Sequence, residues 1–221
     1  MTYSVKEIYL TIQGEGGQTG LPAIFMRFAG CNLWNGLESG RAEAVCKFCD
    51  TDFIGTNGPG GGKFKTAEAL VDELLTHWPV KSGDKWVVCT GGEPLLQLDA
   101  PLIAALHEAG FKIAVESNGT VAAPDGIDWL CVSPKAGADI IQTSGHELKL
   151  VFPQYENHPE DFTEMNFGRF SLQPKDHSFG EFNPEIRDTK NAASLKAALE
   201  YCLTHPKWRL SLQTHKYINI P

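Results

Sequence analysis

The sequence lacks several features that would assign it to a large class of proteins. Its 221 residues include 19 Lys and Arg against 27 Asp and Glu, which gives a formal net charge of -8. Surfaces that bind nucleic acid need a basic face, so nucleic acid is not an expected partner. The N-terminal residues contain no apolar core typical of a signal peptide, and no apolar run approaches membrane-spanning length. These absences predict a cytoplasmic protein without a membrane partner.

The remaining composition is ordinary for a globular protein, with 42% hydrophobic and 21% charged residues. A chain of this length can bury a substantial core, and we expect a single domain over residues 1–221. Without a signal peptide, the six cysteines favour metal binding or catalysis over disulfides.

Three of the cysteines form an incomplete set of metal ligands. Cys31, Cys46 and Cys49 lie on one loop, residues 29–53, which follows an apolar strand-like run. A structural zinc site normally has four ligands, and no histidine lies near these three cysteines. Iron–sulfur clusters also usually take four cysteines, so three would leave one iron open to a group that is not protein. The other three, Cys89, Cys131 and Cys202, lie in apolar patterns where core packing is expected.

Strands alternate with helices along the chain, which predicts an α/β fold with a parallel sheet. Helices are expected from Thr66 to Trp78, from Asp99 to Ala109 and from Ala192 to Thr204. Strands are expected at residues 5–12, 23–28, 85–90, 112–116, 129–133, 148–152, 170–173 and 208–213. A complete eight-fold barrel typically needs about 250 residues. We therefore expect a partial TIM-like barrel of about six parallel strands and about three full helices.

Polar residues gather where these strands end. They are Thr90 to Glu93, Glu116, Ser133 to Lys135, Lys149 and Gln173 to Asp176. Barrels and open α/β sheets place active sites at the carboxyl ends of their strands. The cysteine loop also follows a strand, so we expect it on the same edge.

These motifs resemble the radical S-adenosylmethionine enzymes. The resemblance rests on Cys-x14-Cys-x2-Cys after a first strand and Thr-Gly-Gly-Glu-Pro, residues 90–94, after a second. The usual signature has three residues between its first two cysteines, whereas fourteen separate Cys31 from Cys46, a known variant in one branch. The whole chain is similar to that branch, the 7-carboxy-7-deazaguanine synthases, through residues 9–16, 27–34, 48–53, 132–135, 147–149 and 213–221. Residues 157–183 match least well.

The resemblance implies a [4Fe-4S] cluster on Cys31, Cys46 and Cys49, with S-adenosyl-L-methionine bound to the open iron. One electron would cleave this cofactor to a 5′-deoxyadenosyl radical. Because glycines have no side chain, the backbone at residues 91 and 92 could approach the methionine moiety. The cofactor-binding residues carried over are Phe48, Asp50, Gly92, Ser133, Lys135, Gln173, Pro174, Lys175 and Asp176.

The substrate implied by the resemblance is 6-carboxy-5,6,7,8-tetrahydropterin. After hydrogen is taken from C6, the ring contracts, ammonia leaves and 7-carboxy-7-deazaguanine forms, a carbon–nitrogen lyase step toward queuosine. The substrate-binding residues carried over are Ile12, Gln13, Gly14, Arg27, Thr90 and Pro221. Arg27 would pair with the substrate carboxylate, for which a guanidinium is suited. Without the resemblance, a snorkelling Arg27 and a plain loop connection at residues 13–17 are the simpler interpretations.

A magnesium ion and the C-terminal tail complete this expectation. The resemblance places Mg2+ at Thr51, although residues 50–52 could equally form an ordinary loop or helix cap. The tail, residues 213–221, would close on the substrate through its terminal carboxylate, and Tyr217, Ile218 and Ile220 are available for apolar docking. Glu15, Glu116 and His215 are candidates for proton transfer, but each could be a structural residue.

The family further implies a flavodoxin- or ferredoxin-type electron donor and a homodimer. Two alternatives stay open. In a non-catalytic zinc scaffold, one further cysteine would close the site on Cys31, Cys46 and Cys49. In an activase that abstracts hydrogen from a partner protein's glycine, the cysteine spacing would be compact, unlike the spacing here.

Overall fold

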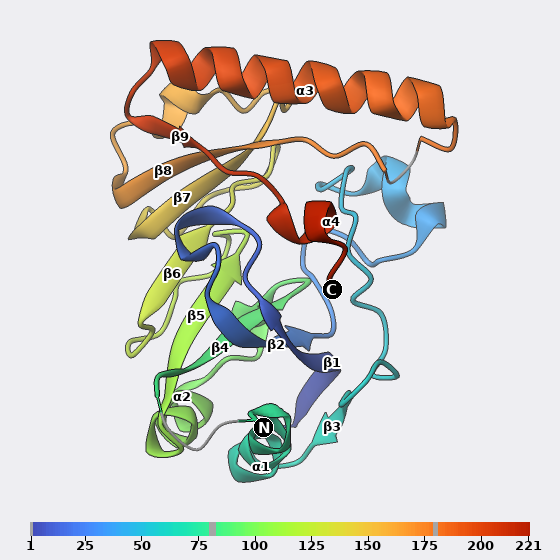
Figure 1. Cartoon of the computed structure of the whole chain (residues 1–221). Coiled ribbons are helices and arrows are strands. Elements are labelled where there is room, and N and C mark those ends of the chain that lie inside the picture. The colour runs from blue at the N-terminus through green and yellow to red at the C-terminus, as the bar shows by residue number, and fades with distance from the viewer. Residues whose placement is uncertain (1, 80–82, 179–180) are drawn as a thin grey trace.

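A nine-stranded sheet runs through the computed structural model, which describes residues 2–79, 83–178 and 181–221 (Figure 1). Its strand order is β3-β1-β2-β4-β5-β6-β7-β8-β9. The strands are β1 (Tyr3–Ile12), β2 (Pro22–Phe28), β3 (Gly62–Phe64), β4 (Lys85–Gly91), β5 (Phe111–Ser117), β6 (Trp129–Val132), β7 (Ser144–Phe152), β8 (Asn166–Pro174) and β9 (Trp208–Leu210). β1 is antiparallel to β2 and β3, and every pair from β2 to β9 is parallel. The predicted α/β class, with a large, mostly parallel sheet and few helices, is confirmed.

The three predicted helices are present, and a short fourth lies in the tail. They are α1 (Ala67–His77), α2 (Ala100–Glu108), α3 (Pro184–Thr204) and α4 (Thr214–Ile218). The N-caps predicted for α1 and α2 are confirmed: the Thr66 and Asp99 side chains accept hydrogen bonds from the amides of Ala69 and Leu102. Short 3-10 turns are η1 (Gly16–Gln18), η2 (Glu38–Glu43), η3 (Pro94–Leu96) and η4 (Pro159–Phe162).

Several boundaries differ from the sequence-based expectation. α3 begins at Pro184 rather than at 192, because the Asn183 side chain caps the amides of Glu185 and Ile186 and proline suits the first helical position. β9 ends at Leu210 rather than at 213, and the Ser211 amide then makes one last bond to the Leu172 carbonyl. β3 was not among the expected strands, and it pairs with the start of β1.

The apolar core lies between the sheet and three helices. α1 packs against β1, α2 against β5, and α3 against β8 and β9. Leu70 and Leu74 of α1, Leu102 and Leu106 of α2, and Cys89 of β4 are fully buried there. Among the described residues, no helix combines the length and apolar character needed to cross a membrane. The other face of the sheet carries many of its buried polar residues, and there the strand ends form the candidate site.

Candidate active site

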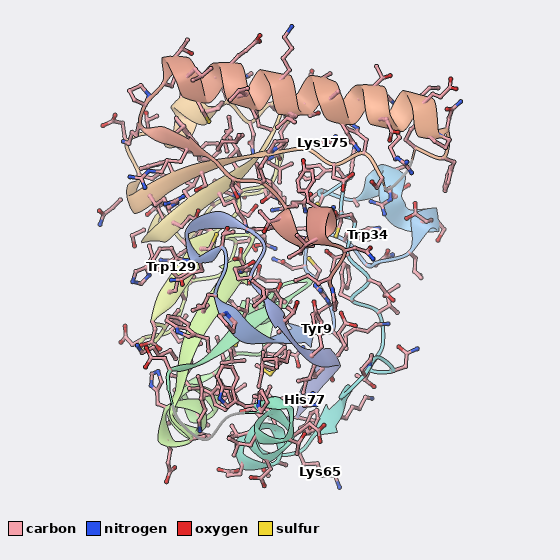
Figure 2. The ribbon with its side chains drawn as sticks, in the orientation of Figure 1. Tyr9, Trp34, Lys65, His77, Trp129 and Lys175 are labelled. Atoms are coloured by element: carbon pink, nitrogen blue, oxygen red, sulfur yellow. The ribbon has the colours of Figure 1, made fainter. Side chains whose placement is uncertain are left out.

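A cavity of about 480 Å3 opens at the carboxyl ends of the parallel strands. Figure 2 labels three of its wall residues around α4: Tyr9 of β1, Trp34 of the cysteine loop and Lys175 after β8. The parallel topology brings these distant segments to one edge, as the strand-end pattern predicts. Every residue singled out from the sequence for the site lines this cavity: Ile12, Gln13, Gly14, Glu15, Arg27, Cys31, Cys46, Phe48, Cys49, Asp50, Thr51, Thr90, Gly92, Glu116, Ser133, Lys135, Gln173, Pro174, Lys175, Asp176, His215 and Pro221.

The expanded cysteine interval folds into a defined loop. The amides of Val45 and Cys46 donate to the Leu33 carbonyl at 3.1 and 3.3 Å, which returns the chain to the first cysteine. The Trp34 and Phe53 rings pack edge to face, with centroids 5.6 Å apart, and anchor the two ends of the loop. The long insertion therefore keeps Cys31 on the same cavity wall as Cys46 and Cys49.

The three thiols lie in an environment that favours a thiolate at one position. The Cys49 thiol donates to Cys46 and, with the nearby positive charge of Lys135, lowers the pKa of Cys46 to about 6. The same hydrogen bond raises the pKa of Cys49. Throughout residues 2–79, 83–178 and 181–221, no three His, Cys, Asp or Glu side chains converge closely enough to hold one metal ion. This spacing does not match a closed zinc site, whereas an iron–sulfur cluster takes each cysteine at a separate iron.

Gly91 and Gly92 are needed for close backbone packing against the cysteine loop. A Cβ at Gly92 would lie 2.1 Å from the Gly30 carbonyl oxygen, and one at Gly91 would lie 2.6 Å from the Phe28 carbonyl oxygen. The next amide, that of Glu93, donates to the Gly30 carbonyl at 3.0 Å. These contacts help to position Cys31. They give a reason for glycine at both positions in addition to the expected approach of a ligand.

Glu93 is a buried carboxylate to which the sequence analysis gave no role. It accepts hydrogen bonds from the Leu95 amide at 3.0 Å, the Ser117 hydroxyl at 2.9 Å and the Asn118 amide at 2.7 Å. Burial raises its pKa. Glu93 thus ties the end of β4 to the end of β5 beneath the cavity wall.

A buried lysine bridges two of the candidate acid–base residues. Lys149 Nζ donates to Glu15 Oε2 at 2.7 Å and to Glu116 Oε2 at 2.9 Å. Burial disfavours the charge on Glu15, but Lys149 and the Gln213 amide outweigh it and lower the pKa of Glu15 to about 2. Burial dominates at Glu116 and raises its pKa. The two carboxylates therefore differ in their tendency to hold a proton.

Lys149 was noted only as a polar strand end in the sequence, and its charge network could not be inferred there. The sequence feature that could have drawn attention to Lys149 is its place between two leucines in an otherwise apolar strand. The expected burial of Cys131 is confirmed, since this residue is fully buried, and its neighbour across the β5–β6 pair is the carboxylate of Glu116.

Arg27 already has two protein partners. Its Nε donates to Glu7 Oε1 at 2.8 Å and its Nη2 to the Tyr9 hydroxyl at 3.2 Å. Glu7 and Arg27 face each other across the β1–β2 pair. The expectation of a guanidinium reserved for a ligand carboxylate is therefore incomplete, because Glu7 partly neutralises it.

The C-terminal tail is docked on the cavity by polar contacts. The Thr214 amide donates to the Gly14 carbonyl at 2.8 Å, and the Thr11 hydroxyl donates to an oxygen of the Pro221 terminal carboxylate at 2.9 Å. A Cβ at Gly14 would lie 2.2 Å from His215 Nδ1, so this glycine makes room for the tail. The expected apolar docking is wrong for Tyr217 and Ile218, which are exposed, whereas Ile220 is half-buried.

One buried acceptor in the cavity wall, on the side chain of Gln173, has no hydrogen-bond donor in the described part of the chain. The acceptor is the Oε1 atom of this side chain. Buried polar atoms are nearly always hydrogen-bonded, so this acceptor points to a donor from a bound ligand.

Comparisons with known proteins identify the family. The radical SAM superfamily pattern matches residues 41–149, beginning inside the expanded cysteine interval. The chain is 60% identical over 221 residues to the 7-carboxy-7-deazaguanine synthase of Caulobacter vibrioides, with 100% of both chains covered. The enzyme of that name from Burkholderia multivorans is 53% identical over the same full length. The chain belongs to the 7-carboxy-7-deazaguanine synthase family.

The fold is also similar to that of a crystal structure, QueE from Escherichia coli. It matches with a TM-score of 0.66 at 23% identity, covering 96% of this chain and 94% of that one. Membership in the radical SAM superfamily implies a [4Fe-4S] cluster and S-adenosylmethionine. Cys31, Cys46 and Cys49 line one cavity and supply the thiol ligands that such a cluster takes, and the pKa of the Cys46 thiol is lowered toward the thiolate form. The family therefore argues against both the zinc scaffold and the glycine-directed activase.

Proposed function

We propose that this protein is a 7-carboxy-7-deazaguanine synthase. It converts 6-carboxy-5,6,7,8-tetrahydropterin to 7-carboxy-7-deazaguanine with loss of ammonia, a carbon–nitrogen lyase reaction in queuosine biosynthesis. The observation that carries the proposal is the end-to-end identity, up to 60%, with relatives of that name. One cavity that joins three cysteines to a hydrogen-bonding wall supports it.

The cluster would be held by Cys31, Cys46 and Cys49, and together with S-adenosylmethionine it supplies a radical able to abstract hydrogen. The protein's part is to hold and orient both ligands and to exclude water. The cofactor wall we propose comprises Phe48, Asp50, Gly92, Ser133, Lys135, Gln173, Pro174, Lys175 and Asp176.

Contacts within this wall support its assignment. Lys135 Nζ donates to the Ser133 hydroxyl at 2.7 Å, and Lys175 Nζ lies 5.0 Å above the centre of the Phe48 ring. The second contact joins the cysteine loop to the end of β8. The unpartnered Oε1 of Gln173 lies in the same wall and would accept a hydrogen bond from the cofactor.

The pterin would bind against Ile12, Gln13, Gly14, Arg27, Thr90 and Pro221. Arg27 would share its guanidinium between Glu7 and the substrate carboxylate, which a planar fork with several donors permits. The C-terminal carboxylate of Pro221 would accept hydrogen bonds from the pterin ring.

Mg2+ would bind at Thr51 near the substrate carboxylate. This ion takes oxygen ligands and usually keeps several waters. The described residues offer no cluster of three acids, so substrate and water oxygens would complete its coordination. The Thr51 hydroxyl already lies 3.5 Å from Asp50 Oδ1.

Proton transfer falls to Glu15, Glu116 or His215. Glu116 is the best placed of these to carry a proton, because burial raises its pKa while Lys149 keeps Glu15 ionised. Burial lowers the pKa of His215, which favours its neutral form.

At the level of the whole molecule, we propose a single domain folded as a partial TIM-like barrel. It would act as a cytoplasmic homodimer that receives electrons from a flavodoxin or ferredoxin. The seven strands of the parallel series, β2 and β4 to β9, with few covering helices, support the incomplete barrel.

The test is turnover by protein purified and reconstituted with iron and sulfide under anaerobic conditions. Given S-adenosylmethionine, a reductant and 6-carboxy-5,6,7,8-tetrahydropterin, it should form 7-carboxy-7-deazaguanine, identified by mass and chromatography. A brown protein that cleaves the cofactor but leaves the pterin intact would refute the proposed substrate. A colourless protein containing zinc would refute the reaction class.

A further inference from the structure

The C-terminal tail is held by few contacts for an element that covers an active site. α4 has five residues, none of them buried, and an isolated helix of this length is not stable in water. Its position therefore depends on side chains that reach from the tail to the body of the protein. In Figure 1 the C-terminus lies near the middle of the molecule beside α4, rather than at its edge.

Lys216 makes the contacts that connect the tail to the cofactor side of the cavity. Its Nζ forms an ion pair with Asp176 Oδ2 and lies 3.5 Å from Asp50 Oδ2. Asp50 directly follows Cys49, and Asp176 lies just after β8. One lysine thus bridges three segments of the cavity wall. The other hydrogen bonds from the tail to the body, made by Gln213, Thr214 and Pro221, reach β1 and the loop after it.

Asp176, the carboxylate that pairs with Lys216, is held in place by further contacts. Asp176 also accepts a hydrogen bond from the Ser178 amide at 2.7 Å. The neighbouring His177 amide donates to Asn191 Oδ1 of α3 at 2.8 Å, and its ring contacts the Ser194 hydroxyl. A pair between a flexible side chain and a rigid carboxylate orders the flexible partner, which here is the tail.

We propose that Lys216 is a positioning residue that closes the substrate end and the cofactor end of the cavity together. It holds the tail, and therefore the Pro221 carboxylate, at a fixed position relative to Asp176 and the cysteine loop. The inference rests on the proposed function, because it assigns the tail to the substrate side and Asp176 to the cofactor side. The side chain of Lys216 itself lines the cavity, but in this role it acts through the tail that it holds.

The test compares Lys216→Met, which removes the charge, with Lys216→Arg, which keeps it. Lys196→Met is the matched control, because Lys196 is an exposed lysine of α3 whose nearest carboxylate, that of Glu200, lies 3.8 Å away. The measurements are kcat and KM for the pterin, and hydrogen exchange of the amides of residues 214–221.

Loss of a charge-assisted contact should raise the pterin KM about tenfold in Lys216→Met, with a smaller change in kcat and faster exchange across the tail. Lys216→Arg should restore both values to within about threefold of the wild type, and the control should match the wild type.

A wild-type KM or wild-type exchange in Lys216→Met would overturn the inference. So would an arginine variant as defective as the methionine variant. Hydrogen exchange can be measured without turnover. If the pterin proves not to be the substrate, the exchange of residues 214–221 still tests whether Lys216 holds the tail.

Discussion

At the scale of single residues, the backbone of Gly30 leaves no room for a side chain at Gly92. Sequence inspection identifies the glycine pair but not its reason, since the partner carbonyl comes from a loop about sixty positions earlier in the chain. The same limit applies to Glu7, which pairs with Arg27 only through the register of β1 and β2. Contacts of this kind depend on topology, which residue types alone do not specify.

Replacing Gly92 with alanine should impair cluster binding. The added Cβ would meet the Gly30 carbonyl and the Cys31 side chain, so the first cysteine must move. We expect Gly92→Ala to retain less than half of the wild-type iron and sulfide after reconstitution. Gly62→Ala is the control, because its Cβ would make only ordinary contacts of 3.4 Å or more. Wild-type iron content in Gly92→Ala would contradict this account.

The buried ion pair of Glu15 should make stability depend on acid pH. Its pKa is about 2 in the folded protein and about 4.5 when unfolded, so ionised Glu15 favours folding above pH 4.5. That contribution, at most about 3 kcal/mol, is lost as the pH falls from 4.5 toward 2. Glu116 has a raised pKa and opposes this trend, because its burial cost is relieved by protonation.

Urea unfolding at pH 5 and pH 3 isolates the effect of Glu15. The free energy of unfolding should fall less between these pH values in Glu15→Gln than in the wild type. Glu164→Gln, which changes an exposed carboxylate, should behave as the wild type does. Equal losses in Glu15→Gln and the wild type would show that Glu15 does not carry the dependence.

At the scale of elements, the sequence predicted helices correctly where apolar periodicity and a capping residue occurred together. Periodic apolar residues and a capping side chain predicted α1 and α2, and polar residues at strand ends predicted the cavity edge. The first turns of α3 are exposed and lack that periodicity, so its start was misplaced. β3 and α4 are too short to carry a pattern and exist through their contacts with β1 and the cavity.

The docked tail makes the C-terminus sensitive to extension. The Thr11 hydroxyl donates to the terminal carboxylate of Pro221, and Pro221 lines the cavity. A peptide tag added after Pro221 removes the terminal carboxylate and should lower kcat/KM for the pterin at least tenfold, whereas the same tag before Met1 should change it less. Comparing the two tagged proteins with a protein whose C-terminal tag has been removed without leaving extra residues checks this. Equal activity of the two tagged proteins would refute a role for the terminal carboxylate.

At the scale of the whole molecule, the sheet explains why residues from position 6 to position 221 share one cavity. The fold class and the cavity residues at the strand ends could be predicted from sequence, because strand ends of a parallel sheet meet at one edge. The other cavity residues, such as Thr51 and Pro221, were implied by the family resemblance. The buried charge network of Lys149 and the polar docking of the tail could not, since each joins side chains that topology alone brings together.

The central claim is that Cys31, Cys46 and Cys49 hold a cluster with one iron left for the cofactor. Electron paramagnetic resonance of the reduced, reconstituted protein tests it most directly, before and after S-adenosylmethionine is added. The account predicts a [4Fe-4S] spectrum that changes on addition, both in the wild type and in a variant in which Cys89, Cys131 and Cys202 are serine. A spectrum that the cofactor leaves unchanged, or a cluster lost from the triple variant while its fold is retained, would contradict it.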